Sequence, residues 1–391
     1  MTLGDVADHV TDGIDPAGAG RLPYVGLEHI RPREMLLARS GDAAEIRSRK
    51  TVFQSGDLLY GKLRPYLDKA VLAEAGGMCS TDILVLRTKS ANTLEDQPGQ
   101  PAADPYFLAG VLHTRDFVSH AIATTAGVNH PRTSWSAVKQ FQLALPPLPE
   151  QRAIAQVLRT VQRAREQTEQ VIAAAQAFKR SLMGHLFTYG LVAVNEVSRV
   201  DLQRADQGDV PSHWEIRPLG EVATLQRGKD LPKADRTGGL HPVVGSNGRV
   251  GAHSEAVASG PGVLVGRSGS VGNVVWEEED FWPLNTTLWV KNFHENDPRF
   301  VFYLLSRFDF RAYASGVSVP TLNRNLIHPV RVGVPQVSEQ REIAAALDAA
   351  ESKLAAETHR RDALDTLFKS LLHYLMAARL RVGDFALGLA S

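Results

Sequence analysis

Basic and polar side chains gather in two pairs of segments, at matching places in the two halves of the chain. Gly61-Lys62-Leu63-Arg64-Pro65-Tyr66 and Gly266-Arg267-Ser268-Gly269-Ser270 each follow an apolar run typical of a buried strand. Asn129-His130-Pro131-Arg132-Thr133-Ser134-Trp135 and Pro320-Thr321-Leu322-Asn323-Arg324-Asn325 each precede the last strand expected in their half. Arg and Lys contact guanine, Asn and Gln contact adenine, and Ser or Thr contact either base or phosphate. Repetition of the pattern favours DNA contact over the alternative of solvated, charged loops.

A further basic segment runs from Arg227 to Arg236, where Asp230 and Asp235 dilute its positive charge. DNA contact and simple solvation are equally open for this segment. The residues predicted to contact DNA are Lys62, Arg64, Tyr66, Asn129, Arg132 and Thr133 in the first half, and Arg227, Lys229, Arg267, Ser268, Ser270, Thr321, Asn323 and Arg324 in the second.

The sequence lacks the motifs of the catalytic classes that act on DNA or nucleotides. An Asn/Asp-Pro-Pro-aromatic loop, which would grip an exocyclic amine, is absent, and Pro146-Pro147 follows Leu145, whose side chain accepts no hydrogen bond. No phosphate-binding Gly-x-x-x-x-Gly-Lys-Ser/Thr loop and no His-Glu-x-x-His pair occurs. The glycine-rich segment 245–251 is interpreted as a tight β-turn, because a weakly helical sequence follows it. We therefore predict no catalytic residue, no metal and no cofactor in this chain.

Composition limits the remaining classes. A length of 391 residues predicts two to three domains, and a 43% hydrophobic content is sufficient for sizeable cores. The formal net charge is zero, which argues against a stand-alone DNA binder but fits a recognition subunit whose partner supplies phosphate contacts. The N-terminus does not resemble a signal peptide, and no apolar run is long enough to span a membrane. Cys79 is the single cysteine, so we expect no disulfide, no cysteine-based zinc site and a cytosolic location.

A long internal repeat organises these segments. Residues 145–155 recur at 334–344, an offset of 189. Upstream, residues 3–7 match 219–223 and residues 58–62 match 263–267, so the two copies differ in loop length. A repeat of this length indicates a duplicated domain rather than a solenoid unit. Duplication of a binding domain predicts a protein with two similar binding sites at a fixed spacing.

Each copy shows the same order of expected elements. The first has strands at 52–53, 57–61 and 83–86, an exposed loop at 90–104 and helical spacing over 105–122. In the second copy Asp297-Pro298 again precedes an apolar helix. Residues 202–214 are polar and are interpreted as a connector.

A proline-rich stop and a long helix follow each globular copy. Apolar residues spaced by three and four predict a heptad seam on each helix, and about 40 helical residues span roughly 60 Å. The alternative is that each helix belongs to one globular core. Helix capping is the favoured role for Glu150-Gln151-Arg152 and its repeat 339–341, ahead of partner binding. The residues predicted to pack the helices are Val157, Val161, Val171, Phe178, Leu182, Ile343, Leu347, Leu354, Leu364, Phe368 and Leu371.

With these features, nearly the whole chain resembles the specificity (S) subunit of type I restriction–modification enzymes. The resemblance rests on segments 24–30, 56–67 and 146–152 of the first half and on 243–248 and 264–272 of the second. The proline stop, Glu-Gln-Arg and long helix, occurring twice, form its most specific element. Residues 335–338 depart from the pattern by lacking the second proline.

The resemblance implies a mixed α/β protein with two similar target recognition domains, separated by two long antiparallel coiled-coil helices and related by a pseudo-two-fold internal repeat. Its implied boundaries are 1–148 for the first recognition domain, 149–190 for the first spacer helix, 191–337 for the second domain, 338–380 for the second helix and 381–391 for a C-terminal tail.

The implied function is non-catalytic recognition of a bipartite, asymmetric site in double-stranded DNA, one domain per half-site, in bacterial or archaeal phage defence. Two methyltransferase (M) subunits would dock on the chain and methylate one adenine per half-site. Through them, restriction (R) subunits would join the complex. S-adenosylmethionine, ATP and Mg would be bound by these partners in the cytoplasm. The alternatives are a coiled-coil scaffold carrying two protein-binding domains, and a self-sufficient methyltransferase.

Overall fold

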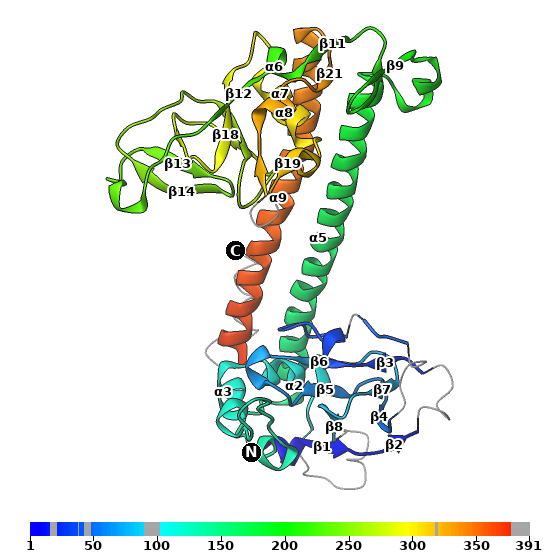
Figure 1. The fold of residues 1–391 in the computed structure, drawn as a ribbon. Helices are drawn as coiled ribbons and strands as arrows, with labels where there is room; N and C mark the ends of the chain where they lie inside the picture. Colours follow the sequence, from blue (N-terminus) through cyan, green and yellow to red (C-terminus); the bar gives the residue numbers. More distant parts are fainter. Residues whose placement is uncertain (16–21, 38, 43–47, 90–101, 317–319, 377–391) are drawn as a thin grey trace, which may run out of the picture. The chain divides into compact units, whose positions relative to one another are not determined.

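The computed structural model describes residues 1–15, 22–37, 39–42, 48–89, 102–316 and 320–376. The chain divides into two compact units: unit 1 comprises Met1–Gln170 and Thr358–Ser391, and unit 2 comprises Val171–Glu357. Two long helices, α5 (Leu148–Tyr189) and α9 (Val337–Met376), each contribute one half to each unit (Figure 1).

Unit 1 holds two sheets, ordered β1-β8-β5-β6 and β2-β4-β7-β3, in which β3 and β7 pair in parallel and the other pairs are antiparallel (Figure 1). The strands predicted at 52–53, 57–61 and 83–86 are confirmed as β4, β5 and β8. The strands of unit 1 are β1 (Ala7–Val10), β2 (Gly13–Ile14), β3 (Tyr24–Val25), β4 (Lys50–Phe53), β5 (Leu58–Gly61), β6 (Ala70–Leu72), β7 (Gly77–Cys79) and β8 (Ile83–Thr88), and its short helices are α1 (Leu3–Val6), η2 (Leu27–His29), η3 (Pro65–Leu67), α2 (Pro105–Leu112), α3 (Arg115–Ala123) and α4 (Trp135–Val138).

The helix expected over 105–122 is divided into α2 and α3. Asp104 caps the first, with Pro105 at its first position, and Thr114 caps the second by accepting from the Phe117 N–H. His113, between the two helices, is buried and bonds Asp68 at 2.7 Å. The break therefore has a local cause, since Thr114 offers a new N-cap where the first helix ends. The exposed loop predicted at 90–104 lies largely outside the described residues.

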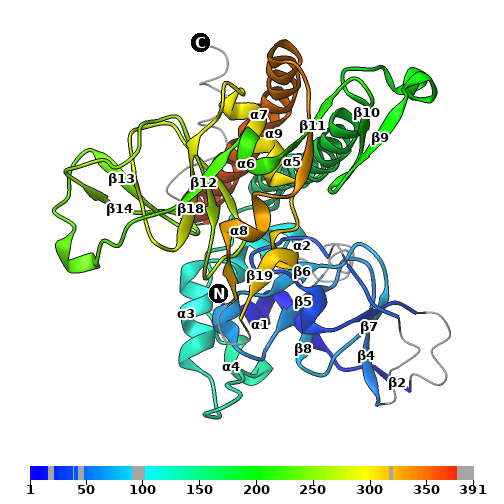
Figure 2. The ribbon, with the colours of Figure 1, turned by 45° about the horizontal axis from the view of Figure 1, so that its top comes forward.

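Unit 2 repeats the main sheet as β12-β18-β15-β16 and the smaller one as β14-β13-β17, with β13 and β17 parallel. Figure 2 shows β12 and β18 of the main sheet and β13 and β14 of the smaller one. The segment 245–251 forms a β-hairpin turn, as predicted. The strands of unit 2 are β9 (Leu202–Ala205), β10 (Gly208–Pro211), β11 (Glu215–Pro218), β12 (Thr224–Arg227), β13 (His241–Gly245), β14 (Gly248–His253), β15 (Gly262–Gly266), β16 (Val274–Glu277), β17 (Trp282–Pro283), β18 (Thr287–Asn292), β19 (Ala314–Ser315), β20 (Thr321–Leu322) and β21 (Arg331–Val334), and its short helices are η5 (Val194–Arg199), α6 (Leu219–Val222), η6 (Lys233–Asp235), α7 (Pro298–Ser306), η7 (Phe310–Tyr313) and α8 (Arg324–Ile327).

The segment 202–214 is more than a connector. It forms the β9–β10 hairpin and ends at Trp214, which is buried in the core of unit 2 against Phe187 and Phe300. Its indole N–H donates to Glu339 at 3.1 Å. The segment is polar overall, but its one large aromatic residue, Trp214, packs the hairpin against the long helices.

The long helices begin close to the predicted positions, and both contribute to the core of each unit. In unit 1, Leu158 of α5 and Phe368 of α9 join one apolar cluster; in unit 2, Phe187 of α5 and Leu347 of α9 join another. Helix α5 ends at Tyr189, and the following residue, Gly190, has a φ of 73° that suits a residue without Cβ just after a helix C-terminus. Residues 377–380 of the predicted second helix, and the tail 381–391, lie outside the described residues.

The predicted seam is correct at some positions and wrong at others. Val161, Ile343, Leu347, Phe368 and Leu371 are buried, and Val157, Leu182, Leu354 and Leu364 are partly buried. Val171 and Phe178 are 42% and 60% exposed, so they do not pack between the helices.

The true stripe on α5 passes through the next residue in each case. Ile172 is buried in place of Val171, and Lys179 faces α9 in place of Phe178, where it pairs with Glu351. Arg165 occupies the equivalent position one heptad before Ile172 and two heptads before Lys179, and it pairs with Asp365 at 2.5 Å. Because charged residues fill part of the seam, a search for apolar residues alone selects the neighbouring positions.

Candidate nucleic-acid interface

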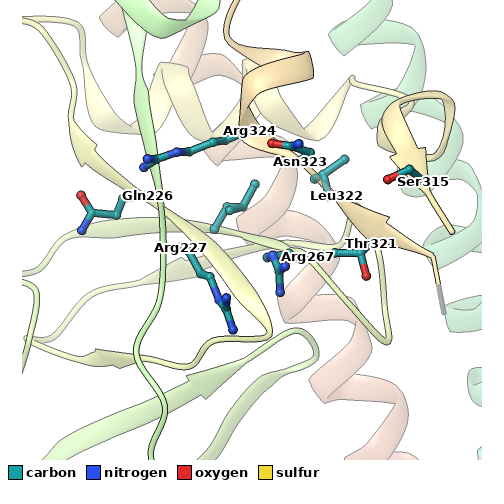
Figure 3. Close-up of a pocket in the computed structure, with 9 residues that line it drawn as sticks. Gln226, Arg227, Arg267, Ser315, Thr321, Leu322, Asn323 and Arg324 are labelled. Carbon is teal, nitrogen blue, oxygen red and sulfur yellow. The ribbon is translucent and has the colours of Figure 1, made fainter.

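A pocket of about 540 Å³ opens in unit 2 where four segments meet (Figure 3). Five of the residues predicted to contact DNA line it: Arg227, Arg267, Thr321, Asn323 and Arg324. The other lining residues are Gln226, Leu288, Ser315 and Leu322. Segments almost 100 residues apart in sequence thus bring three guanidinium groups to one opening.

Backbone hydrogen bonds hold the segments that carry these side chains. Arg267 follows the buried strand β15; its N–H donates to Thr286 O at 2.8 Å, and its carbonyl accepts from Leu322 N–H at 2.9 Å. Ser268 and Thr321 form an isolated antiparallel bridge. The loop after β15 is therefore fixed against strand β20, and the Arg267 side chain is displayed from a rigid frame (Figure 3).

The pocket is lined by three positively charged side chains. Within the described residues, no carboxylate lies at ion-pair distance from Arg227, Arg267 or Arg324. Arg267 donates to the carbonyl of Asn285 at 3.4 Å, and Arg324 donates to the carbonyl of Leu225 at 3.3 Å. Burial, and then the charge of Arg227, lower the pKa of Arg267, which nevertheless stays protonated. Such an arrangement attracts phosphate and the acceptor edges of bases.

The remaining candidates of unit 2 differ in their position relative to the pocket and in the hydrogen-bonding groups that they can offer to DNA. Lys229, Ser268 and Ser270 lie in the same loops but outside the pocket lining. Asn323 caps α8, its side-chain oxygen accepting from Asn325 N–H at 3.0 Å. Since a paired contact to adenine needs both amide groups of an asparagine, the capped Asn323 offers only its N–H₂.

Sequence reasoning missed Gln226 and Ser315. Gln226 neighbours Arg227 at the end of β12, so its position beside a candidate was a usable signal. Ser315 reaches the pocket because β19 pairs with β20, placing it opposite Thr321. That pairing spans residues of weak strand pattern, and nothing local in the sequence indicated it.

Unit 1 builds the same frame with different side chains. Lys62 N–H donates to Asp82 O at 2.9 Å, and Arg132 forms an antiparallel bridge with Leu63. Arg64 adopts a left-handed backbone with φ of 52° and its N–H donates to Pro131 O at 2.8 Å.

Lys62 is partly exposed, and Arg64, Asn129 and Arg132 are exposed around this bridge, together with Tyr66, whose exposed fraction is 55%. Thr133 is a correction to the predicted set, because it is 3% exposed and its hydroxyl bonds that of Thr124 at 2.9 Å. Its side chain supports the bridge and is not available to DNA.

The known proteins that this chain resembles are specificity proteins of type I restriction–modification systems. The family model of the type I restriction modification DNA specificity domain matches residues 211–366. The specificity subunit of the Escherichia coli type I restriction enzyme EcoDI is 25% identical over 43% of this chain and 32% of its own length. The chain thus spans about a third of that relative. The MjaVIII specificity subunit of Methanocaldococcus jannaschii is 18% identical over 94% of this chain and 88% of the relative.

Two solved structures share the fold. The S subunit of a type I restriction–modification system from M. genitalium has a TM-score of 0.65 at 16% identity, covering 96% of this chain and 95% of that one. A chain from a structure of type I complex assembly and conformational transition has a TM-score of 0.57 at 19% identity, covering 96% of both chains.

In sequence over residues 211–366 and in fold over nearly its whole length, the chain is similar to type I specificity subunits. The predicted recognition and the mixed α/β fold, with two β-rich regions and two long packed helices, are confirmed. The matched segment is described as a DNA specificity domain of type I restriction modification proteins. None of the helices in the described part of the chain is long and apolar enough to cross a membrane.

The glutamine of the Glu-Gln-Arg motif has a structural role in both units. Gln151 is 1% exposed, donates to Ala102 O and Pro146 O, and accepts from Asp104 N–H. Gln340, also 1% exposed, makes the corresponding bonds to Pro335 O and Asp297 N–H. The glutamine is therefore a long-range anchor, rather than the local helix cap that the sequence favoured.

Proposed function

We propose that this chain is a type I specificity subunit and that it reads a bipartite, asymmetric site in double-stranded DNA, with unit 1 reading one half-site and unit 2 the other. The observation that carries the proposal is the set of three guanidinium groups, from Arg227, Arg267 and Arg324, that surround one pocket without a carboxylate partner in the described chain. The equivalent frame in unit 1 displays Lys62 and Arg64. Two similar frames with different side chains suit two different half-sites.

Within each half-site the loops would combine phosphate contact with direct readout. Arg227 is exposed and suits phosphate, while the half-buried Arg267 has fewer conformations and suits a base edge. Sequence-dependent distortion of the DNA adds to the readout, because a partner that methylates a base must take it out of the stack.

The domain boundaries proposed from the sequence make the long helices the spacer that sets the distance between half-sites. Two methyltransferase subunits would dock along these helices, and restriction subunits would join through them. Exposed apolar residues on the helices support docking: Phe178 is 60% exposed, Leu367 45% and Tyr374 44%. The partners would bind S-adenosylmethionine, ATP and Mg, and the complex would act in the cytoplasm of a bacterium or archaeon.

The test is selection from a randomised pool of duplex DNA by the full-length chain, purified with the methyltransferase encoded beside it. The proposal predicts enrichment of two short motifs at a fixed separation, with affinity that falls steeply as salt rises. A complex that enriches no sequence and binds duplex without salt dependence would leave the protein-binding scaffold as the better description.

A further inference from the structure

Arg132 and Asp82 form an ion pair in unit 1, at positions where unit 2 has uncharged residues. The backbone identifies the equivalent position of Asp82. Lys62 N–H donates to Asp82 O at 2.9 Å, and Arg267 N–H donates to Thr286 O at 2.8 Å, in the same loop after the same strand. Asp82 therefore corresponds to Thr286, which carries no charge.

The equivalent of Arg132 follows from the bridge that closes each frame. Arg132 bridges Leu63, and Thr321 bridges Ser268, in both cases antiparallel. The two positions are 189 residues apart, the offset of the sequence repeat at this point. Of the two copies of this frame, the one in unit 1 therefore carries the ion pair, which distinguishes its surface from that of unit 2.

The ion pair leaves one edge of the Arg132 guanidinium free. Nε donates to Asp82 Oδ1 at 2.8 Å, Nη2 to Asp82 Oδ2 at 3.4 Å, and Nη1 to His130 O at 3.3 Å. A guanidinium has five N–H donors in a fixed planar fork. Three are engaged, so one donor remains on Nη1 and one on Nη2. The side chain is 43% exposed, so this edge is open to solvent.

Two adjacent N–H donors match O6 and N7 of guanine, which are both acceptors in the major groove. We propose that Arg132 reads a guanine in the half-site of unit 1, and that Asp82 is the positioning residue that fixes the arginine for this contact. The inference rests on the proposed function, and it names the base class that one frame recognises.

Asp82 remains charged in this environment. The hydrogen bond from Arg132 is the main cause that lowers the pKa of Asp82, and the nearby Lys62 and His130 act in the same direction. A carboxylate on a DNA-facing surface repels phosphate. Removal of its charge should therefore strengthen non-specific binding, whereas loss of positioning should weaken discrimination. These opposite effects distinguish two roles of Asp82: positioning of Arg132, or only neutralisation of its charge.

The experiment uses the full-length chain in complex with its methyltransferase and the duplex site selected by the wild type. Each guanine of each half-site is replaced in turn, and the dissociation constants are measured for wild type, Asp82→Asn, Arg132→Ala and Arg132→Lys. We expect one guanine, in one half-site only, at which the wild type discriminates roughly ten- to hundred-fold. Arg132→Ala and Arg132→Lys should abolish that preference. Arg132→Lys should retain non-specific affinity, because the charge is kept without the fork.

Asp82→Asn should reduce the same preference several-fold while binding of unrelated duplex stays equal or becomes tighter. Combined with Arg132→Ala, it should cause no further loss of preference. Asp209→Asn is the matched control, since Asp209 forms an exposed pair with Arg204 at 2.9 Å in the β9–β10 hairpin. It should change neither quantity.

The outcomes separate the two proposals. If the wild type selects no bipartite site, the proposed function fails and this inference fails with it. If a bipartite site is selected but Arg132→Lys leaves every guanine preference intact, the inference alone is overturned. The same holds if Asp82→Asn alters affinity equally for all duplexes. Should Asp82→Asn fold poorly, by its thermal midpoint, Arg132→Lys and a partial rescue by Asp82→Glu decide the question.

Discussion

Gln340 accepts a hydrogen bond from the backbone N–H of Asp297, with 2.8 Å between the two atoms. Gln151 accepts the same bond from Asp104, also at 2.8 Å. Each aspartate caps the helix that follows it, so the glutamine at the start of a long helix holds the first turn of α2 or α7. This contact couples the long helices to the globular core in both copies of the repeat.

Gln340→Ala should destabilise the protein by about 1–3 kcal/mol, because it leaves the Asp297 N–H and the Pro335 carbonyl buried without a partner. Gln151→Ala should do the same in unit 1. Urea denaturation followed by circular dichroism measures the loss. Gln156→Ala, at an exposed position of α5, is the control and should stay within about 0.5 kcal/mol of wild type. If Gln340→Ala and Gln156→Ala were equally stable, Gln340 would not be an anchor between the long helix and the core.

Ile172→Ala and Phe178→Ala test the corrected helix seam. Ile172 is 8% exposed, and its truncation should cost about 2–5 kcal/mol. Phe178 is 60% exposed, so removal of its larger side chain should cost about 0.5 kcal/mol or less. Both variants are compared by denaturant midpoint on the full-length chain without partners. A larger loss for Phe178→Ala than for Ile172→Ala would restore the seam predicted from the sequence.

His328 should make stability depend on pH. Burial, and then the charge of Arg324, lower its pKa from the usual 6.5, and its Nε2 accepts from Leu225 N–H at 3.0 Å. The unfolded chain therefore binds a proton more readily than the folded one. The contribution of neutral His328 is fully present above pH 6.5 and is lost as pH falls through the lower folded pKa.

The measurement compares denaturant midpoints at pH 7.5 and 5.5 for wild type and His328→Gln, which keeps an acceptor but does not titrate. The midpoint of the wild type should fall more on acidification than that of the variant. An identical fall in both proteins would show that His328 titrates as an exposed histidine does.

Arg267→Ala should weaken DNA binding, and the salt dependence of that binding distinguishes a phosphate contact from a base contact. If Arg267 contacts phosphate, the slope of log K against log salt should decrease by about 0.9. If it contacts a base, the slope should stay nearly constant and a preference at one position should disappear. Arg204→Ala, an exposed arginine already paired with Asp209, is the control and should leave both unchanged. If Arg267→Ala changed neither the DNA affinity nor its salt dependence, DNA would not bind at the pocket.

Local sequence patterns predicted the elements whose causes are local. The buried strands β5 and β8 were visible as apolar runs, and Asp297-Pro298 marked a helix start that the structure confirms. The hairpin turn at 245–248 followed from its glycines. These features depend on residues within a few positions of one another, which is the range at which turn and capping chemistry acts.

Features that depend on distant partners were not predictable in the same way. Thr133 is adjacent in sequence to the exposed Arg132, and only the backbone bridge shows that its side chain turns inward to Thr124. The role of Gln340 depends on Asp297, 43 residues earlier. Arg132 was selected as a basic residue, but its pairing with Asp82, 50 residues away, required the fold.

The most direct test of DNA reading by both units is the methylation pattern produced in a living host. The chain and its adjacent methyltransferase are co-expressed in a strain without DNA methylation, and N6-methyladenine is mapped by single-molecule sequencing. The account predicts a two-part motif with one modified adenine in each half. Arg267→Ala should relax or remove only the half read by unit 2 and preserve the other. No modification by a stable complex, or an equal effect of Arg267→Ala on both halves, would contradict it.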